Sequence, residues 1–243
     1  MSEHDVIQSL EATGRYRVLE RLQAPERYQE GSPQTPRIGI VIDTETTGID
    51  IRQDKIIELG FVAFEYDATS GLIYRILHTF DGFEDPKEPL SDIVKRITGI
   101  DDAMLVGQAL DDAEIEPWLL KADLVIAHNA AFDRPMLERR FTKLEGMAWA
   151  CTFKDIDWDA ENIASRKLDY IAFQLGYFFD GHRAVNDAQA TLHLLTCALP
   201  TSKQLAMGQL LMLAREVRQR FFAIAAPFDK KDVTTVRRKI VRQ

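Results

Sequence analysis

The pattern of apolar positions predicts three consecutive β-strands within residues 37–80. Ile38, Ile40 and Ile42 share one face of the first strand and Val41 lies on the other, a two-sided pattern typical of a central strand covered on both faces. The runs 55–66 and 72–80 are also rich in β-branched and aromatic residues. The polar segment 67–71 between these two runs predicts a hairpin turn.

Helical periodicity dominates the rest of the chain. Helices and loops are expected over residues 89–120, and the apolar run 124–127 predicts a buried strand that leads into a helix from about residue 132 to residue 141. Two further helices are expected, one over 168–175 that stops at Gly176 and one that carries Leu192, Leu195 and Leu199. An antiparallel meander followed by α/β units indicates the α/β class, with a mixed sheet and helices packed on it.

The segments on either side of this domain have a different character. Val18, Leu19 and Leu22 share one face of an expected short helix, and residues 31–36 have the Gly, Ser and Pro content of a linker. We therefore divide the chain into an N-terminal helical extension with a linker (1–36), a main domain (37–200) and a C-terminal helix with a basic tail (201–243). A solvated charged end is the favoured interpretation of that tail.

The composition favours a soluble, cytoplasmic protein with one sizeable core. The chain has 243 residues, 46% hydrophobic content and a net charge of -8. This charge argues against coating nucleic acid through a broad basic surface, but it permits local contacts at a strand end. The apolar run 221–228 is too short to span a bilayer, so no membrane association is expected. Cys151 and Cys197 stand in unlike contexts, which favours buried thiols.

Two acids stand at the end of the first strand, in the segment Asp43-Thr44-Glu45-Thr46-Thr47-Gly48. A period of two places both carboxylates on one face, with Cα atoms roughly 7 Å apart. Two anions held this close stay ionised only beside a cation, and a hard divalent ion such as Mg²⁺ satisfies that need. The alternative is a strand that simply ends in a polar turn.

A third acid, Asp133, follows the strand 124–127 in the segment His128-Asn129-Ala130-Ala131-Phe132-Asp133. Its structural alternative is a helix N-cap, a role that Asp performs commonly. Asn129 beside Phe132 favours a binding role, because an amide next to a ring suits a sugar or phosphate beside a stacked base. Phe132 could equally belong to the core.

A fourth acid, Asp187, opens the helix that carries Leu192, and His182 lies in the loop before it. Asp187 could again be a helix cap. An imidazole titrates close to neutral pH and can remove a proton from a water molecule, the step that a hydrolase of this kind requires. Four acids and one histidine, each at a strand end or a helix start, predict a two-metal hydrolase site. In such sites two ions roughly 4 Å apart hold the attacking and leaving oxygens of an in-line displacement at phosphorus.

These segments resemble the three motifs of the DEDDh exonucleases, which include the proofreading epsilon subunit of bacterial DNA polymerase III. The matching residues are Asp43-x-Glu45-Thr-Thr-Gly, Asn129-x-x-Phe132-Asp133 and His182-x-Ala184-x-x-Asp187. The resemblance covers about residues 37–199. Residues 149–151 and 221–232 are also similar to stand-alone bacterial proteins described as polymerase III epsilon-like.

The resemblance implies a ribonuclease H-like fold with a mixed five-stranded sheet flanked by helices, and a DEDDh exonuclease domain over 37–200. It implies two Mg²⁺ ions, for which Mn²⁺ is expected to substitute. The implied ligands are Asp43, Glu45, Asp133 and Asp187, with His182 as the base. The implied contacts to the 3′-terminal nucleotide come from Thr46, Thr47, Asn129 and Phe132, and the implied product is a nucleoside 5′-monophosphate.

The chain departs from the family pattern at two places. Thr98-Gly99-Ile100 stands where many relatives have His-Gly-Ile, so no substrate contact from that histidine is carried over. An Arg-Gly-Tyr-x-Trp stretch that usually follows the C-terminal segment is absent after Val236. Any nucleic-acid or partner function of that extension is therefore in doubt.

The sequence leaves several functions open. The resemblance favours a 3′ to 5′ exonuclease that acts on DNA 3′ ends in repair or proofreading, and it allows a protein partner from replication or repair. An exoribonuclease is the nearest alternative, because no residue here reads a 2′-hydroxyl unmistakably. A non-catalytic nucleic-acid-binding module would be expected to lack an acid or the histidine. A two-metal phosphatase acting on small esters would need no base-stacking platform.

Overall fold

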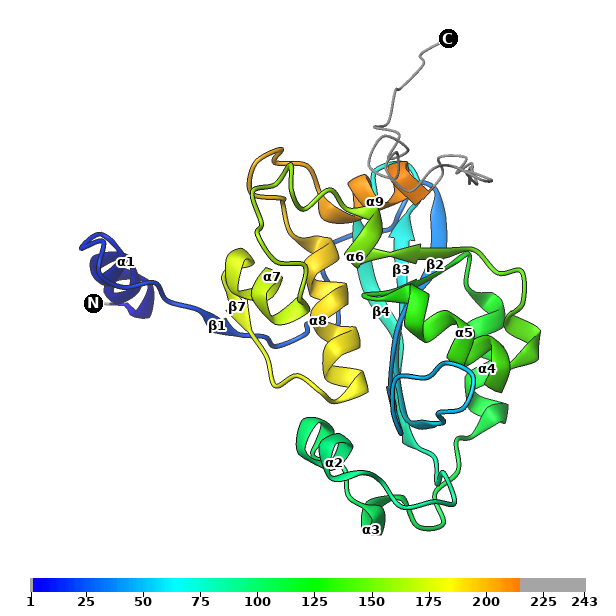
Figure 1. Cartoon of the computed structure of the whole chain (residues 1–243). Coiled ribbons are helices and arrows are strands. Elements are labelled where there is room, and N and C mark those ends of the chain that lie inside the picture. Colours follow the sequence, from blue (N-terminus) through cyan, green and yellow to red (C-terminus); the bar gives the residue numbers. More distant parts are fainter. Residues whose placement is uncertain (1, 215–243) are drawn as a thin grey trace, which may run out of the picture.

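Five strands form one mixed sheet in the computed structural model, which describes residues 2–214 (Figure 1). The strand order is β4-β3-β2-β5-β6; β2, β3 and β4 are antiparallel neighbours, and β5 and β6 run parallel to β2. The expected mixed sheet and its opening three-strand meander are confirmed. The strands are β2 (Pro36–Thr46), β3 (Ile56–Asp67), β4 (Ile73–Phe83), β5 (Leu124–Ala127) and β6 (Trp149–Cys151).

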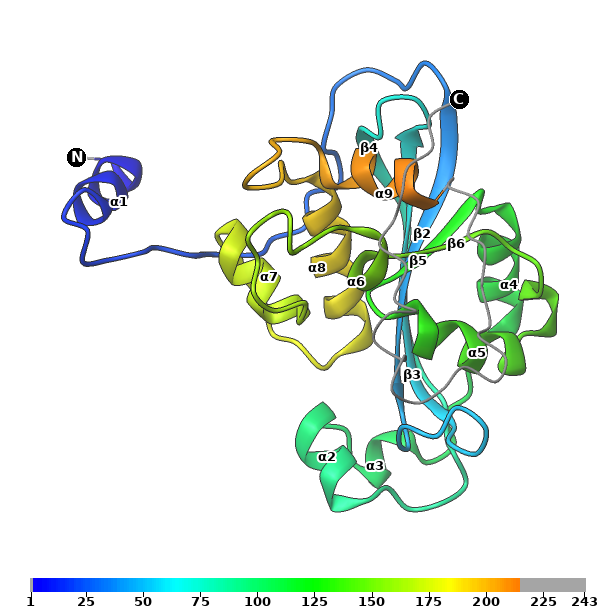
Figure 2. The same cartoon turned by 45° about the horizontal axis from the view of Figure 1, so that its top comes forward.

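Helices cover both faces of this sheet (Figure 2). Apolar residues of α7, α8 and α9 pack on one face together with Val41, and apolar residues of α4 and α5 pack on the other face together with Ile40 and Ile42. The two-sided pattern of β2 therefore reflects two separate cores. The helices are α1 (Glu3–Glu11), α2 (Asp92–Thr98), α3 (Asp102–Leu105), α4 (Asp112–Lys121), α5 (Ala130–Arg140), η1 (Thr142–Leu144), α6 (Thr152–Asp155), α7 (Leu168–Leu175), α8 (Ala184–Thr196) and α9 (Ala206–Ala214).

Local signals set several helix ends. Gly176 has a φ of 96° and ends α7 in the left-handed conformation, as predicted. The helix expected from about residue 132 begins two residues earlier, at Ala130, which places Pro135 beyond its first turn. Leu199 lies after the end of α8, although it is buried against the same core.

The helix predicted around Val18, Leu19 and Leu22 is wrong. This segment is extended, and its strand β1 (Glu20–Arg21) pairs in parallel with β7 (Tyr177–Phe178). The Glu20 N–H donates to the Gly176 carbonyl at 3.1 Å and the Leu22 N–H donates to the Phe178 carbonyl at 2.8 Å. Pairing with a distant strand satisfies the backbone here and overrides a weak helical periodicity.

The helix of this N-terminal region lies earlier, at α1, and projects away from the rest of the molecule (Figure 1). It starts at a capping box, in which the Ser2 hydroxyl accepts the Asp5 N–H at 3.2 Å and the Asp5 carboxylate accepts the Ser2 N–H at 2.7 Å. Sequence reasoning missed this helix, although Val6, Ile7 and Leu10 have helical spacing and Ser2 and Asp5 form its capping box.

Residues 20–29, part of the predicted N-terminal extension, contact the main domain directly. The Tyr28 N–H donates to the Tyr74 carbonyl at 2.8 Å, and the Ile76 N–H donates to the Glu26 carbonyl at 2.9 Å, so this segment runs beside β4. The side chains of Leu22 and Tyr28 pack on the core formed with α7, α8 and α9. The domain boundary near residue 37 stays a prediction.

The remaining expectations concern cysteines, membranes and the tail. Cys151 is buried, Cys197 is partly buried, and both are free thiols. Among residues 2–214, no helix combines the length and the apolar character needed to cross a bilayer. The predicted C-terminal helix begins at α9, and the basic tail and the run 221–228 lie outside the described residues.

Candidate active site

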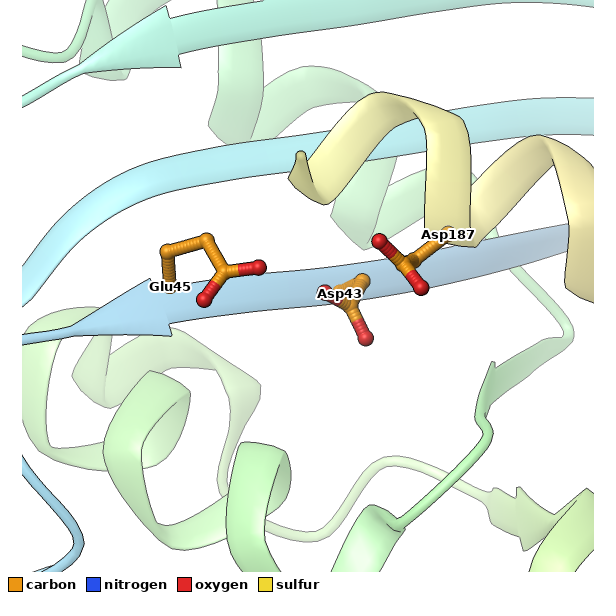
Figure 3. Close-up of side chains that lie close together, drawn as sticks. All are labelled: Asp43, Glu45 and Asp187. Atoms are coloured by element: carbon orange, nitrogen blue, oxygen red, sulfur yellow. The ribbon is translucent and has the colours of Figure 1, made fainter. Parts of the chain in front are cut away.

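Three predicted acids converge where β2 ends (Figure 3). Asp43 and Glu45 project from the same face of β2, as their spacing predicts, and Asp187 reaches the same space from the first turn of α8. Each residue offers a carboxylate oxygen, and these three atoms lie within 4.8 Å of one another. Segments about 140 residues apart thus supply one cluster of half-buried acids.

The close approach of α8 to the sheet depends on Gly60. Gly60 is the β3 residue that pairs directly with Asp43. A Cβ on Gly60 would lie 2.1 Å from the Val185 nitrogen and 2.3 Å from the Ala184 carbonyl carbon. The start of α8 therefore packs against bare backbone, which brings Asp187 within reach of Asp43.

Asp133 lies beside this cluster rather than within it. It is only 3% exposed, in the first turn of α5, and its carboxylate accepts a hydrogen bond from the Thr44 hydroxyl at 2.9 Å. The N-cap position of α5 is Asn129, so the N-cap interpretation of Asp133 is wrong. The negative charge of Asp133 nevertheless contributes to raising the pKa of Asp43, and the two acids act on each other electrostatically.

Asp187 is not the N-cap residue of α8, which is Arg183, but it lies in the first turn of that helix. Its carboxylate accepts the Arg183 N–H at 3.2 Å, just before α8 begins. The same carboxylate also belongs to the three-acid cluster. One side chain therefore completes the start of the helix and contributes to the site.

Burial and mutual repulsion make the acids difficult to ionise together. Burial, followed by the charges of its acidic neighbours, raises the pKa of Asp43 well above its ordinary value and that of Glu45 to about 8. Burial also raises the pKa of Asp133 to about 7 and that of Asp187 to about 6. A divalent cation would relieve this repulsion, and a donor set made only of carboxylate oxygens fits a hard ion such as Mg²⁺.

His182 lies in the loop immediately before α8, with an exposed side chain. Its φ of 63° is in the left-handed region, which residues other than glycine adopt uncommonly. The positive charge of a protonated His182 opposes the rise in the pKa of Asp187 that burial causes, so the two side chains are electrostatic neighbours. The fold therefore brings the predicted base to the edge of the acid cluster.

A second histidine, His128, is tied into the structure. Its Nε2 lies 2.8 Å from the Arg166 carbonyl, which can only accept, so Nε2 carries the proton; Nδ1 lies 2.8 Å from the Thr152 hydroxyl. Burial lowers the pKa of His128 to about 4. His128 is thus a neutral link between β5 and the loop before α7.

The hydroxyls of Thr46 and Thr47 are engaged within the turn that follows β2. The Thr46 hydroxyl donates to the Gly48 carbonyl at 2.5 Å, and the Thr47 hydroxyl donates to the Asp54 carboxylate at 2.9 Å. Arg139 of α5 donates to the carbonyls of Ile51 and Asp54 and so holds the turn against the helix. The predicted contact of these threonines with a nucleotide stays a prediction.

Asn129 and Phe132 lie at the start of α5, where the predicted substrate contacts would require them. Asn129 is exposed and makes no side-chain hydrogen bond to cap the helix. Phe132 is half-buried and belongs to none of the core clusters formed by the described residues. The core interpretation of Phe132 therefore lacks support, and its contact with a nucleotide stays a prediction.

Sequence reasoning missed two residues that shape the site, Glu58 and Arg183. Glu58 is fully buried on β3 and pairs in register with Glu45. Arg183 follows His182 and forms an ion pair with Glu58 at 2.7 Å. A single acid inside the apolar run 56–64 was the signal that could have found Glu58.

Comparison with known proteins identifies the family. The model of the RNase T family, described as Exonuclease, matches residues 40–195 and so spans the sheet and all four acids. The chain belongs to this exonuclease family. Membership places it among hydrolytic nucleases, and the resemblance predicted from the three motifs is confirmed.

Curated relatives include PolC-type DNA polymerases III. The chain is 31% identical over 162 residues to the polymerase of Caldanaerobacter subterraneus subsp. tengcongensis, a match that covers 64% of this chain and 11% of the polymerase. The polymerase of Thermotoga maritima is 30% identical over 177 residues, covering 70% and 12%. The chain therefore spans only about one ninth of the length of these relatives.

Solved structures support the fold. Exonuclease I has a TM-score of 0.56 at 17% identity, over 74% of this chain and 44% of that chain. E. coli Exonuclease I in complex with a dA16 oligonucleotide has a TM-score of 0.54 at 14% identity, over 71% and 42%. The expected ribonuclease H-like arrangement, a mixed five-stranded sheet flanked by helices, is confirmed.

Proposed function

We propose that this protein is a Mg²⁺-dependent 3′ to 5′ exonuclease that hydrolyses phosphodiester bonds at DNA 3′ ends and releases nucleoside 5′-monophosphates, in repair or proofreading. The observation that carries the proposal is the convergence of Asp43, Glu45 and Asp187, whose oxygens lie within 4.8 Å of one another. Three acids that disfavour one another's ionisation destabilise the metal-free fold, but they form a good binding site for a cation.

The four acids divide the work of holding metal. Asp43, Glu45 and Asp187 are the proposed direct ligands, and Asp133 assists from its hydrogen bond with Thr44. When bound, two divalent ions would supply charge neutralisation at the attacking and leaving oxygens, and Mn²⁺ is expected to substitute for Mg²⁺. The Thr44 hydroxyl keeps one Asp133 oxygen fixed, which leaves the other oxygen for the site.

His182 is the proposed general base. Its exposed imidazole borders Asp187, so it can reach a water molecule held at the acid cluster. An imidazole nitrogen that carries no proton can accept one from such a water molecule. We expect Asn129 and Phe132, at the start of α5, to contact the terminal nucleotide, the amide at its polar part and the ring at its base.

The choice of DNA rests on the relatives. The PolC-type matches are DNA polymerases, and a structure of Exonuclease I was solved with a dA16 oligonucleotide. An enzyme that takes one strand end needs only local positive charge, which is compatible with a net charge of -8.

A degradation assay with three matched substrates tests this proposal. Single-stranded DNA, duplex DNA and RNA of the same sequence carry a 5′ label and are incubated with the protein and Mg²⁺, then with EDTA. We expect the single-stranded DNA to shorten from its 3′ end, and EDTA to stop the reaction. An RNA ladder with intact DNA would make the protein an exoribonuclease. Intact oligonucleotides, with small phosphate esters hydrolysed instead, would refute the proposal.

A further inference from the structure

Glu58 is an unusual residue for its place in the fold. It is 0% exposed, in a strand whose neighbouring residues are apolar, and it pairs across the sheet with Glu45. Its charge also adds to the effects that raise the pKa of Glu45 and Asp43. A buried carboxylate that also disfavours the ionisation of two neighbouring acids destabilises the fold unless a cationic partner compensates its charge.

Arg183 is that partner. Its Nε donates to Glu58 Oε1 at 2.8 Å and its Nη2 lies 2.7 Å from the same oxygen, while Oε2 accepts the Ala184 N–H at 3.1 Å. The guanidinium also lies 5.3 Å from the centre of the Phe83 ring, and its Nη2 is 3.9 Å from the Asp81 carboxylate. Three side chains on β3 and β4 therefore hold the two residues that follow His182.

His182 needs such support because of its backbone. Its φ of 63° is a conformation that costs energy in residues other than glycine and persists where the surroundings impose it. On the other side of the loop, the Asn186 amide donates to the Asp180 carbonyl at 2.8 Å. The loop is thus closed at its base and fixed to the sheet through Glu58.

We infer that Glu58 and Arg183 are a positioning pair that holds His182 in its left-handed conformation beside Asp187. The inference rests on the proposed function, in which His182 is the base. An arginine suits this role better than a lysine, because its planar group donates from two nitrogens in a fixed geometry while it packs on the Phe83 ring. Neither Glu58 nor Arg183 need touch the substrate.

A double-mutant cycle tests whether the pair acts through His182. Glu58→Gln keeps the size of the side chain, and Arg183→Lys keeps its charge. We expect each variant to lower kcat about 10- to 100-fold with little change in KM, because a small misplacement of a reacting group lowers the rate by about this factor. In a His182→Ala background, the same two changes should lower kcat less than about 2-fold. The matched control is Arg75→Gln, which removes the 3.0 Å ion pair between Arg75 on β4 and Glu65 on β3. This variant should leave kcat unchanged both in the wild type and in His182→Ala.

If the effects of Glu58→Gln and His182→Ala on kcat were fully additive, the inference would be overturned. Glu58 would then act on the acid cluster or on the stability of the fold, and not through His182. Should Glu58→Gln fail to fold, Arg183→Lys decides, since the Arg183 side chain is 36% exposed.

A readout that needs no activity separates this inference from the proposed function. The NMR resonance of the His182 ring, recognised by its absence in His182→Ala, should shift in Glu58→Gln and Arg183→Lys and stay unchanged in Arg75→Gln. An unchanged resonance in the first two variants would refute the positioning role whether or not the protein is a nuclease. If the resonance shifts but the protein has no nuclease activity, the positioning role of Glu58 and Arg183 stands and the proposed function is wrong.

Discussion

At the scale of single residues, the acid cluster lowers the stability of the metal-free fold at neutral pH. Asp187, with a pKa raised to about 6, and Glu45, with a pKa raised to about 8, hold protons more tightly in the folded state than in the unfolded state. An acid whose pKa is raised by folding stabilises the fold at low pH, and this contribution is lost as the pH rises through the pKa of the folded state. The metal-free protein should therefore become less stable as the pH rises from about 5 to about 8.

We predict that Asp187→Asn removes part of this penalty. In EDTA at about pH 8, the Tm of the variant should exceed that of the wild type, and its rise with added Mg²⁺ should be smaller. Thermal unfolding followed by circular dichroism measures both quantities. Glu145→Gln, which changes an exposed acid after η1, is the control and should behave as wild type. A lower Tm for Asp187→Asn in EDTA would contradict the repulsion argument.

His182→Ala should separate chemistry from metal binding. Loss of a general base lowers turnover by about 10²- to 10⁴-fold, whereas the Mg²⁺-induced rise in Tm depends on the acids and should survive. Single-turnover degradation of labelled DNA and thermal unfolding with and without Mg²⁺ give the two values. A Tm rise that disappears together with activity would make His182 a metal ligand.

Asp43→Ala tests the residue at the centre of the cluster. It should abolish cleavage, because the Asp43 carboxylate lies within 4.8 Å of those of Glu45 and Asp187, where the proposed metal ligands meet. The folded core should persist, since the substitution removes a ligand and a repulsion rather than apolar contacts. Wild-type turnover in this variant would remove the site from consideration.

Sequence reasoning found the candidate site residues because each stands at a recognisable local boundary. Asp43 and Glu45 end an apolar strand, and His182 and Asp187 precede and open a helix. Sequence reasoning missed Glu58 because the role of this residue depends on a partner 125 residues away. The apolar run 56–64 indicates that this acid is buried, but the identity of its partner is a property of the tertiary structure.

At the scale of elements, the site depends on how closely α8 packs on β3. We predict that Gly60→Ala displaces the start of α8, since its Cβ would lie 2.1 Å from the Val185 nitrogen. Overpacking of this kind destabilises a fold by about 1–3 kcal/mol, and activity should fall more than about 10-fold because Asp187 moves with the helix. Thermal unfolding and turnover measure the two effects.

Gly208→Ala is the matched control for Gly60→Ala. Gly208 lies in α9, where an added Cβ would meet the Ser70 carbonyl oxygen at an ordinary distance of 3.6 Å. Alanine also has the higher helix propensity, so the Tm should stay the same or rise. Equal losses in both variants would mean that the close approach at Gly60 has no special role.

The elements themselves differ in how much of them the sequence predicts. The three long strands and the end of α7 were predicted, because alternation and a terminal glycine are local signals. The error at Val18, Leu19 and Leu22 has the opposite cause, since the backbone of that segment pairs with β7, more than 150 residues further along the chain. A short apolar run with helical spacing cannot reveal such a partner.

At the scale of the whole molecule, the N-terminal region has two parts with different roles. The helix α1 projects from the body, whereas Leu22 and Tyr28 pack on the main core. We predict that deletion of residues 2–14 changes the Tm by less than about 2 °C. Deletion of residues 2–29 should lower it by about 5 °C or more, since the packing of the partly buried Leu22 and Tyr28 and the β1–β7 pairing are lost together. Equal Tm values for the two truncations would show that the β1–β7 pairing adds nothing.

The crowding of Asp43, Glu45, Asp133 and Asp187 has a consequence for protein engineering. Every substitution that neutralises one of these acids relieves repulsion in the metal-free fold. A library sorted for heat resistance in a chelating buffer would therefore enrich such substitutions first, and its survivors would be robust and inactive. The same library sorted in Mg²⁺ would keep the acids, because the ion then makes the functional sequence the more stable one.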